Sequence, residues 1–426
     1  MTGIKEKFIS SIKRGTGEVF QILKQNPQLD FFSEIIKAAI KNYTPNVQDE
    51  GTRSRYIYEL ANLSPNKSKI RKAILKGLSE GKNDSDTLDQ LYGIAYLYAK
   101  QGDKEFYNAI YKRYFSNRIK HADSLGEYEI LKLDGINGLK YIAEIRGRNL
   151  KKNPRYWKDD SLIKSFQEDN PKLDVLKDLK NAGKTNSNIK RYLETIQNYK
   201  SPIFKKEKIK ITAEFVEKRI AQNKIVPLHG DEIKQLSKSD ILKIADNFLK
   251  ETKRIRKEKY LRIFSYIKFP FGYMPLLKEA KQKDNRKDRL IEFACDSLKF
   301  FKNNNIRRFA IKQIPKSKFP SIYISLLITN YKSGDGKMLT KLVKKEEQQW
   351  KIHSLAMSYI DLYKKNKAKD CKQPLIELYD KLTCGHCRHE IIKIMIDNKV
   401  LPFKIKKEIH RDSYEETRKL WKKLVN

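Results

Sequence analysis

The residues best suited to chemistry lie in one short stretch, Thr383–Glu390, whose sequence is TCGHCRHE. The stretch contains two of the four cysteines in the chain and two of its six histidines. Two cysteines separated by two residues at a helix start can do dithiol redox chemistry, because the helix dipole lowers the pKa of one thiol. The same two thiols can also bind a zinc ion.

A redox role would rest on the four residues CGHC, which resemble the active-site sequence of protein disulfide isomerases. The resemblance covers those four residues alone. In those enzymes the motif follows a buried strand, usually with Trp just before it. Here it follows QPLIELYDKL, a segment whose pattern is typical of a helix.

A zinc site would need four ligands, and Cys384, Cys387, either His386 or His389, and Cys371 could supply them. The sequence has no second CxxC pair and no HxxxH pair, so half of such a site would depend on single residues. We adopt the structural alternative, in which both cysteines of the motif are small, semi-buried residues at the start of a helix. We therefore expect no metal, no cofactor and no catalytic residue.

Other catalytic signatures are absent from the sequence. The glycine-containing stretches at 13–18 and 133–148 lack the P-loop pattern, and there is no GxSxG, HExxH, EF-hand or kinase motif. We expect Gly135 and Gly138 to allow a close approach between helices. His353, like His121, is isolated in the sequence, which is typical of a structural histidine.

Length and composition indicate a folded, mostly helical protein. The 426 residues are 39% hydrophobic, which is enough for a core, but include only 18 Gly and 13 Pro, few for a protein of short strands and tight turns. No run approaches the roughly 18 apolar residues of a membrane span. The first residues, MTGIKEKFISSIKRGTGE, have charges where a signal peptide needs an apolar centre. We expect an all-α, cytoplasmic protein with reduced thiols and no membrane partner.

The formal net charge of +39 is the strongest global signal. Residues 1–150 carry 25 Lys and Arg against 18 Asp and Glu, whereas residues 151–426 carry 66 against 34. Such an excess attracts polyanions at long range, so nucleic acid is the first partner to consider. The alternative is a compositional bias of an AT-rich genome, which encodes many lysines.

Two similar segments indicate a repeated helical unit. NKSKIRKAILKGL at 66–78 and NNNIRRFAIKQI at 303–314 both have a polar turn, then Ile-Arg, then an apolar helical face. RDSYEETRKLW at 411–421 has a related form, with a capping box of Ser413 and Glu416.

This pattern resembles HEAT or armadillo-like helical repeats, in which a turn with an acidic or amide residue precedes a helix that carries a hydrophobic-Arg pair. The matching positions are Ile70-Arg71, Ile306-Arg307, Asp412 with Arg418, and Asp49 with Arg55. The turns depart from the usual pattern, with Asn66 and Asn303 in place of Asp. The resemblance implies an α-solenoid of antiparallel helix pairs; a generic helical bundle is the alternative.

The sequence divides into three expected parts. Residues 1–150 form an N-terminal helical repeat arm, residues 151–285 a basic, less regular helical segment or hinge, and residues 286–426 a C-terminal HEAT-like arm. In the middle part, 237–266 is expected to be one long helix or a helix pair, with Ser239 as its cap.

The basic residues concentrate in several clusters that a concave helical surface could bring together. Any one cluster is more often a solvated face, so the functional interpretation depends on several of them converging. The predicted nucleic-acid-binding residues are Lys205, Lys206, Lys208, Lys253, Arg254, Arg256, Lys257, Lys259, Arg262, Arg307, Arg308, Lys344 and Lys345.

These observations favour a non-enzymatic basic scaffold that binds DNA or RNA mainly through the phosphate backbone. One alternative is a nucleic-acid enzyme such as the HEAT-like alkylpurine DNA glycosylases, an analogy of fold alone, because their catalytic positions cannot be matched here. A second alternative is a protein-protein interaction adaptor for acidic partners.

Overall fold

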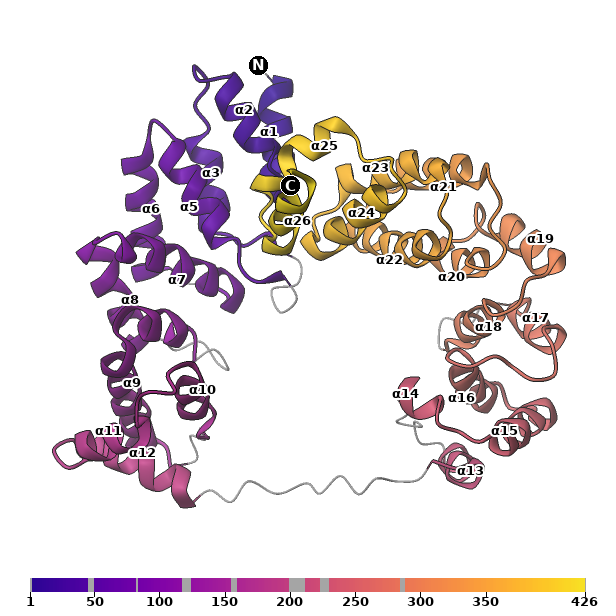
Figure 1. The fold of residues 1–426 in the computed structure, drawn as a ribbon, viewed down its shortest axis with the longest axis horizontal. Helices are drawn as coiled ribbons and strands as arrows, with labels where there is room; N and C mark the ends of the chain where they lie inside the picture. The colour runs from indigo at the N-terminus through magenta and orange to yellow at the C-terminus, as the bar shows by residue number, and fades with distance from the viewer. Residues whose placement is uncertain are drawn as a thin grey trace. The chain divides into compact units, whose positions relative to one another are not determined.

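A computed structural model describes residues 2–44, 50–81, 83–116, 124–154, 159–198, 211–222, 230–283 and 288–425 (Figure 1). All regular secondary structure in these ranges is helical, which confirms the expected all-α class. Among the helices of the described ranges, none is long and apolar enough to cross a membrane.

The chain divides into two compact units. Unit 1 comprises Met1–Lys205 together with Lys407–Asn426, and unit 2 comprises Lys206–Lys406. Unit 2 is therefore a continuous stretch inserted into the sequence of unit 1. This division differs from the three ranges expected from the sequence.

Unit 1 is built from short helices joined by polar turns. Their bounds are α1 (Thr2–Arg14), α2 (Glu18–Gln25), α3 (Phe32–Ala39), α5 (Ser54–Leu63), α6 (Lys67–Glu80), α7 (Ser85–Lys100), α8 (Lys104–Ser116), α9 (Glu127–Lys152), α10 (Ser161–Asp169), α11 (Val175–Gly183), α12 (Ser187–Asn198), the 3-10 helix η3 (Ile409–Arg411) and α26 (Glu415–Val425).

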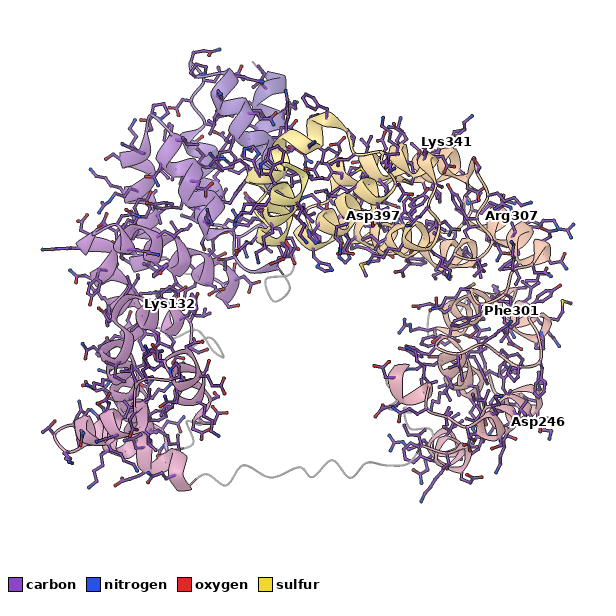
Figure 2. The ribbon with its side chains drawn as sticks, in the orientation of Figure 1. Lys132, Asp246, Phe301, Arg307, Lys341 and Asp397 are labelled. Atoms are coloured by element: carbon purple, nitrogen blue, oxygen red, sulfur yellow. The ribbon has the colours of Figure 1, made fainter. Side chains whose placement is uncertain are left out.

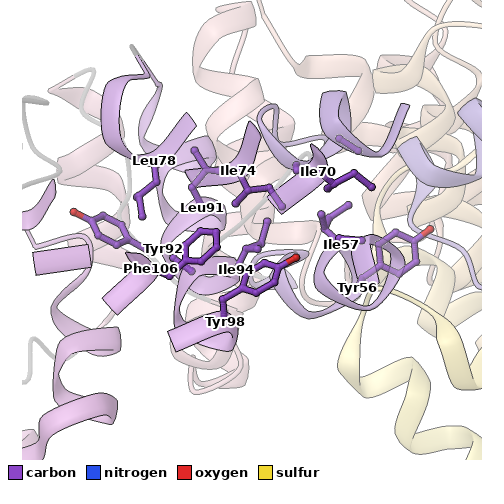
Figure 3. Packing of buried hydrophobic residues seen from close by; sticks show 14 of the residues in the cluster. Tyr56, Ile57, Ile70, Ile74, Leu78, Leu91, Tyr92, Ile94, Tyr98 and Phe106 are labelled. Carbon is purple, nitrogen blue, oxygen red and sulfur yellow. The ribbon is translucent and has the colours of Figure 1, made fainter. Parts of the chain in front are cut away.

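The core of unit 1 follows the apolar spacing of the sequence (Figure 3). Ile70, Ile74 and Leu78 recur at every fourth residue along α6, so they form one stripe, and all three are fully buried. Leu91 of α7 and Phe106 of α8 are fully buried in the same cluster. Helices pack on the next but one in the chain, α5 on α7 and α6 on α8, as well as on their immediate neighbours.

A bidentate ion pair between Arg71 and Asp103 connects α6 to the start of α8. Arg71, on the second turn of α6, donates from Nε and Nη2 to the two carboxylate oxygens of Asp103 at 2.7 and 2.8 Å. Asp103 directly precedes α8 and also accepts the backbone N–H of Glu105 and Phe106. One carboxylate thus caps a helix and binds an arginine of the preceding helix pair.

The segment after residue 406 packs on the first helices of the chain. The backbone N–H of Ser413 donates to the carbonyl of Gly15 at 2.7 Å, and Arg411 forms an ion pair with Glu59 at 3.0 Å. A side chain at Gly17 would place its Cβ 2.1 Å from the carbonyl oxygen of Glu408, so glycine permits this close approach.

Unit 2 has the same construction from short helices. Their bounds are α13 (Ala213–Ala221), α14 (Gly230–Ile233), α15 (Lys238–Lys250), α16 (Arg254–Phe264), α17 (Met274–Ala280), α18 (Leu290–Leu298), α19 (Asn304–Gln313), α20 (Pro320–Ile324), α21 (Asp335–Lys345), α22 (Gln349–Lys365), α23 (Lys372–Lys381) and α24 (Gly385–Asp397), with the 3-10 helices η1 (Ser325–Leu327) and η2 (Lys369–Cys371), and α25 (Phe403–Glu408) ends just beyond unit 2.

Packing on the next but one helix is also found in unit 2, where α16 contacts α18, α20 contacts α22, α21 contacts α23 and α22 contacts α24. The segment 237–266 is a helix pair, α15 and α16. Its cap is Ser237 rather than the expected Ser239, because the Ser237 hydroxyl accepts the backbone N–H of Asp240 at 3.1 Å.

The expected close approach between helices is found at Gly138, where two helical segments of α9 meet across a kink at Gly135. Gly135 has φ 53° and ψ −124°, a conformation that side chains rarely adopt, and it kinks α9. A Cβ on Gly138 would lie 2.6 Å from the carbonyl oxygen of Ile130, on the other side of the kink. Both glycines therefore accommodate the bend.

Candidate nucleic-acid interface

Arg254, the predicted arginine at the start of α16, is engaged in an ion pair. Arg254 donates from Nε and Nη2 to Asp288 at 2.6 and 3.1 Å, and from Nη1 to the side chain of Gln282. Asp288 also accepts the backbone N–H of Leu290 at the start of α18. Arg254 thus resembles Arg71 in unit 1, because each arginine binds an aspartate that also accepts a backbone N–H at the start of a later helix. The Arg254 charge is neutralised within the fold.

Other predicted cations of unit 2 are also neutralised by carboxylates. Lys257 lies 2.7 Å from Glu279, and both side chains are largely buried. Arg256 lies 3.7 Å from Glu251. On the exposed side of α21, Lys344 lies 3.5 Å from Glu377. These contacts stabilise helix packing and reduce the positive charge offered to a ligand.

Among the described parts of the chain, the other predicted residues do not line the hollow that Arg307 and Arg308 share. Lys253 and Lys345 are exposed at opposite ends of their helices, and Arg262 is half-buried. Burial lowers the pKa of Lys259. The expected cations Lys205, Lys206 and Lys208 lie outside the described residues.

Two predicted residues, Arg307 and Arg308, line a hollow on α19 together with other cations. Figure 2 labels Arg307. The main part of the hollow has a volume of about 720 Å³, and an adjoining part has about 320 Å³. We name these two parts together the α19 hollow. Its lining residues are Lys302, Asn303, Asn304, Arg307, Arg308, Ile311, Lys312, Thr329, Asn330, Tyr331 and Lys332.

All of the charged residues that line the α19 hollow are positive. Five of its lining residues are Lys or Arg, and none of the lining residues is acidic. The carboxylate that pairs with them among the described residues is Asp335, which binds Arg307 at 2.7 Å. The hydrogen bonds that Arg307 donates to Asp335 raise the pKa of its guanidinium, so it stays charged.

Hydrogen bonds between α19 and the segment before α21 hold the shape of the hollow. Arg307 donates to the carbonyl of Asn330 at 2.8 Å, in addition to Asp335. The side-chain oxygen of Asn330 accepts the backbone N–H of Asn303 at 2.7 Å. Asn303 in turn caps α19 by accepting the N–H of Asn305. The backbone around the hollow is thus fixed by polar contacts that are independent of a ligand.

The exposed cations of the hollow are Arg308, Lys312, Lys302 and Lys332. Arg308 and Lys312 are four residues apart on α19 and so share one face of the helix. Cations and amide donors on one surface can bind phosphate oxygens, whereas this set contains no nucleophile paired with a base. The arrangement is suited to binding and not to bond cleavage.

Sequence reasoning did not identify Lys302, Lys312 and Lys332 as site residues. The spacing of four residues between Arg308 and Lys312 could have predicted that Lys312 lies on the same helix face as Arg308. Lys332 reaches the hollow only because the turn before α21 folds back beside α19, a contact between segments that no local pattern reveals.

The cysteines of the TCGHCRHE motif are buried at the start of α24, in agreement with the structural expectation. Cys384 is the residue before the helix, and its sulfur accepts the backbone N–H of Cys387 at 3.3 Å.

No known protein family, curated protein or solved structure compared with this chain matches it. The geometry of the described residues is therefore the basis for the functional argument.

Proposed function

We propose that this chain is a non-enzymatic helical scaffold that binds DNA or RNA through the phosphate backbone, with the α19 hollow as its best-defined contact surface. The observation that carries the proposal is the set of five Lys and Arg residues around that hollow, with no acidic lining residue. A phosphate backbone offers closely spaced negative charges that can occupy such a set.

The same surface has little that could distinguish one base from another. Arginine, lysine and amide side chains on an open hollow contact phosphate and sugar oxygens regardless of sequence. We therefore expect binding with little sequence specificity.

We also propose that the helices of each unit are stacked as HEAT-like antiparallel pairs. Packing of each helix on the next but one is the contact pattern of such stacks, and it recurs in both units. The Arg–Asp pairs support this interpretation, because each joins an arginine of one helix to an aspartate at the start of a later helix.

The test is a salt titration of binding to fluorescently labelled duplex DNA and single-stranded RNA, followed by anisotropy. Between about 50 and about 200 mM salt we expect the affinity to fall steeply, because phosphate contacts release bound counterions. Affinity that is independent of salt would contradict the proposal. Release of a base from alkylated duplex DNA would contradict its non-enzymatic part.

A second candidate function, an adaptor for acidic protein segments, is favoured by a separate hollow of about 610 Å³. Phe248, Leu249 and Met274 contribute apolar surface to it, and Lys278 and Lys281 add positive charge beyond the ion pair of Lys257 and Glu279. Met274 is 62% exposed, so its side chain can contribute apolar contact area to a partner.

An amphipathic helix with acidic and apolar faces matches this chemistry. A synthetic peptide of that kind should bind the full chain and lose affinity in the Met274→Asp variant. Equal affinity for both proteins would exclude the adaptor function at this hollow.

A further inference from the structure

The structure brings a third metal-ligating side chain to the cysteines of the TCGHCRHE motif. One potential ligand atom from each of His353, Cys384 and Cys387 lies within 4.8 Å of the other two. The expected candidates Cys371, His386 and His389 are not part of this cluster among the described residues. His353, which is isolated in the sequence, takes their place.

Two packed helices of unit 2 supply these residues. His353 lies on α22, and the cysteines lie at the start of α24, which packs on α22. Met357 follows His353 by one helical turn, and its sulfur is 3.8 Å from that of Cys387. Both cysteines are buried, whereas His353 is exposed, so the cluster lies at the edge of the helix packing with a side open to solvent.

The turn that presents the cysteines is held rigidly by a buried arginine. Arg388 is fully buried, and its Nη1 donates to the carbonyl of Thr383 at 3.0 Å and to that of Leu382 at 3.4 Å. The sulfur of Cys384 accepts the N–H of Cys387, a contact that also stabilises a thiolate. The arginine therefore fixes the backbone from which the two cysteines project.

The spacing of the ligand atoms is close to that of a tetrahedral zinc site. Bonds of about 2.3 Å to sulfur and about 2.0 to 2.1 Å to nitrogen place ligand atoms about 3.4 to 3.8 Å apart. Side-chain rotations that bring these atoms closer by about 1 Å would give that spacing. Two thiolates and a neutral imidazole also balance the charge of a divalent cation.

We propose that His353, Cys384 and Cys387 form a zinc site between α22 and α24. Binding forms two Zn–S bonds and one Zn–N bond and releases two thiol protons to solvent, so affinity decreases as the pH falls. Solvent would complete the fourth position, because the exposed His353 leaves the cluster open on one side. The metal joins two helices of the unit and adds its binding free energy to their packing.

The test measures zinc and cobalt binding by the full chain, purified under reducing conditions. Mass spectrometry of the metal content after dialysis should give one zinc per chain. Titration with Co²⁺ should produce the thiolate-to-metal charge-transfer band of a site with two sulfur ligands. The double variant Cys384→Ser, Cys387→Ser should lose both signals.

His353→Ala is the decisive variant, because its side chain is exposed and its removal leaves the buried packing intact. Its zinc affinity should fall by more than about tenfold, with an unchanged circular dichroism spectrum. Cys371→Ala and Cys295→Ala remove buried thiols outside the cluster and should retain zinc. Met357→Leu should retain it too, because zinc sites in proteins are formed by Cys, His, Asp and Glu side chains.

Three results would overturn the proposal. The first is a wild-type chain that binds neither zinc nor cobalt. The second is a His353→Ala variant with wild-type affinity. The third is a disulfide between Cys384 and Cys387 that forms in a glutathione buffer and leaves no thiols for a metal, which would assign the motif to redox chemistry.

Discussion

Arg307 on α19 and Asp335 at the start of α21 are joined by two hydrogen bonds of 2.7 Å each. The Asp335 carboxylate is buried and also accepts the backbone N–H of Lys332 at 2.9 Å. It therefore stabilises the start of a helix and a neighbouring arginine at the same time. Asp335 is also the carboxylate that limits the positive charge of the α19 hollow.

Replacement of this carboxylate should change stability and binding in opposite directions. In Asp335→Asn we expect the free energy of unfolding in urea to fall by about 2 kcal/mol, because charge-assisted hydrogen bonds are lost. Affinity for labelled DNA should rise, because the hollow loses a negative charge.

The matched control for this variant is Asp103→Asn in unit 1, where Asp103 also accepts two hydrogen bonds from an arginine, through Nε and Nη2 of Arg71. It should lose a similar amount of stability without a change in DNA affinity. Equal effects of both substitutions on binding would show that the α19 hollow is not the contact surface.

Charge reversal on the exposed rim of the α19 hollow should reduce both affinity and its salt dependence. In the variant Arg308→Glu, Lys312→Glu, Lys332→Glu, the slope of log affinity against log salt should decrease by about 2 to 3, because each phosphate contact contributes about 0.7 to 0.9. Anisotropy titrations measure the slope.

The control for charge reversal substitutes three exposed lysines of unit 2 outside the hollow, Lys341, Lys365 and Lys372, with glutamate. It changes net charge by the same amount. If this control weakened binding equally, total charge rather than the hollow would determine affinity.

A side chain at Gly17 should disrupt the packing of residues 407–426 in unit 1. The Cβ of Gly17→Ala would lie 2.1 Å from the carbonyl oxygen of Glu408, so the backbone must move, at a cost of about 3 kcal/mol. Thermal unfolding and limited proteolysis after Lys407 measure the effect. Gly3→Ala, where a Cβ meets nothing within 4 Å, should not destabilise the protein.

Glu129 should make stability dependent on pH near neutrality. Burial raises its pKa from 4.5 to about 7, and the charge of Asp89 adds to the increase. Because the folded state binds this proton more tightly than the unfolded chain, stability is greatest below pH 4.5 and declines until about pH 7. Over this pH range the free energy of unfolding should fall by about 3 kcal/mol.

The variant Glu129→Gln removes this decline, so above pH 7 it should be more stable than the wild type in urea unfolding. Glu6→Gln, at an exposed position, should keep the wild-type dependence. A wild-type pH profile in Glu129→Gln would assign the dependence to other groups.

The helices were predictable wherever the apolar pattern was regular. Ile70, Ile74 and Leu78 define a buried stripe by spacing alone, because a period near four residues places them on one face of a helix. The cap of α15 was misplaced by two residues, at Ser239 rather than Ser237, because both serines precede the apolar run.

The candidate sites were less predictable, because their residues come from segments far apart in the sequence. Arg254 appears in the sequence as one cation of a basic cluster, yet it is paired with Asp288, two helices later. His353 meets Cys384 only through the packing of α22 on α24. Such contacts depend on tertiary structure and leave no trace in local spacing.

The insertion of unit 2 into unit 1 affects the order of events during synthesis. Gly15 and Glu59 are translated early, but their partners Ser413 and Arg411 leave the ribosome only after all of unit 2. Unit 2 can therefore fold before unit 1 is complete. Until residues 407–426 are synthesised, the surface of the first helices that they cover stays exposed to solvent.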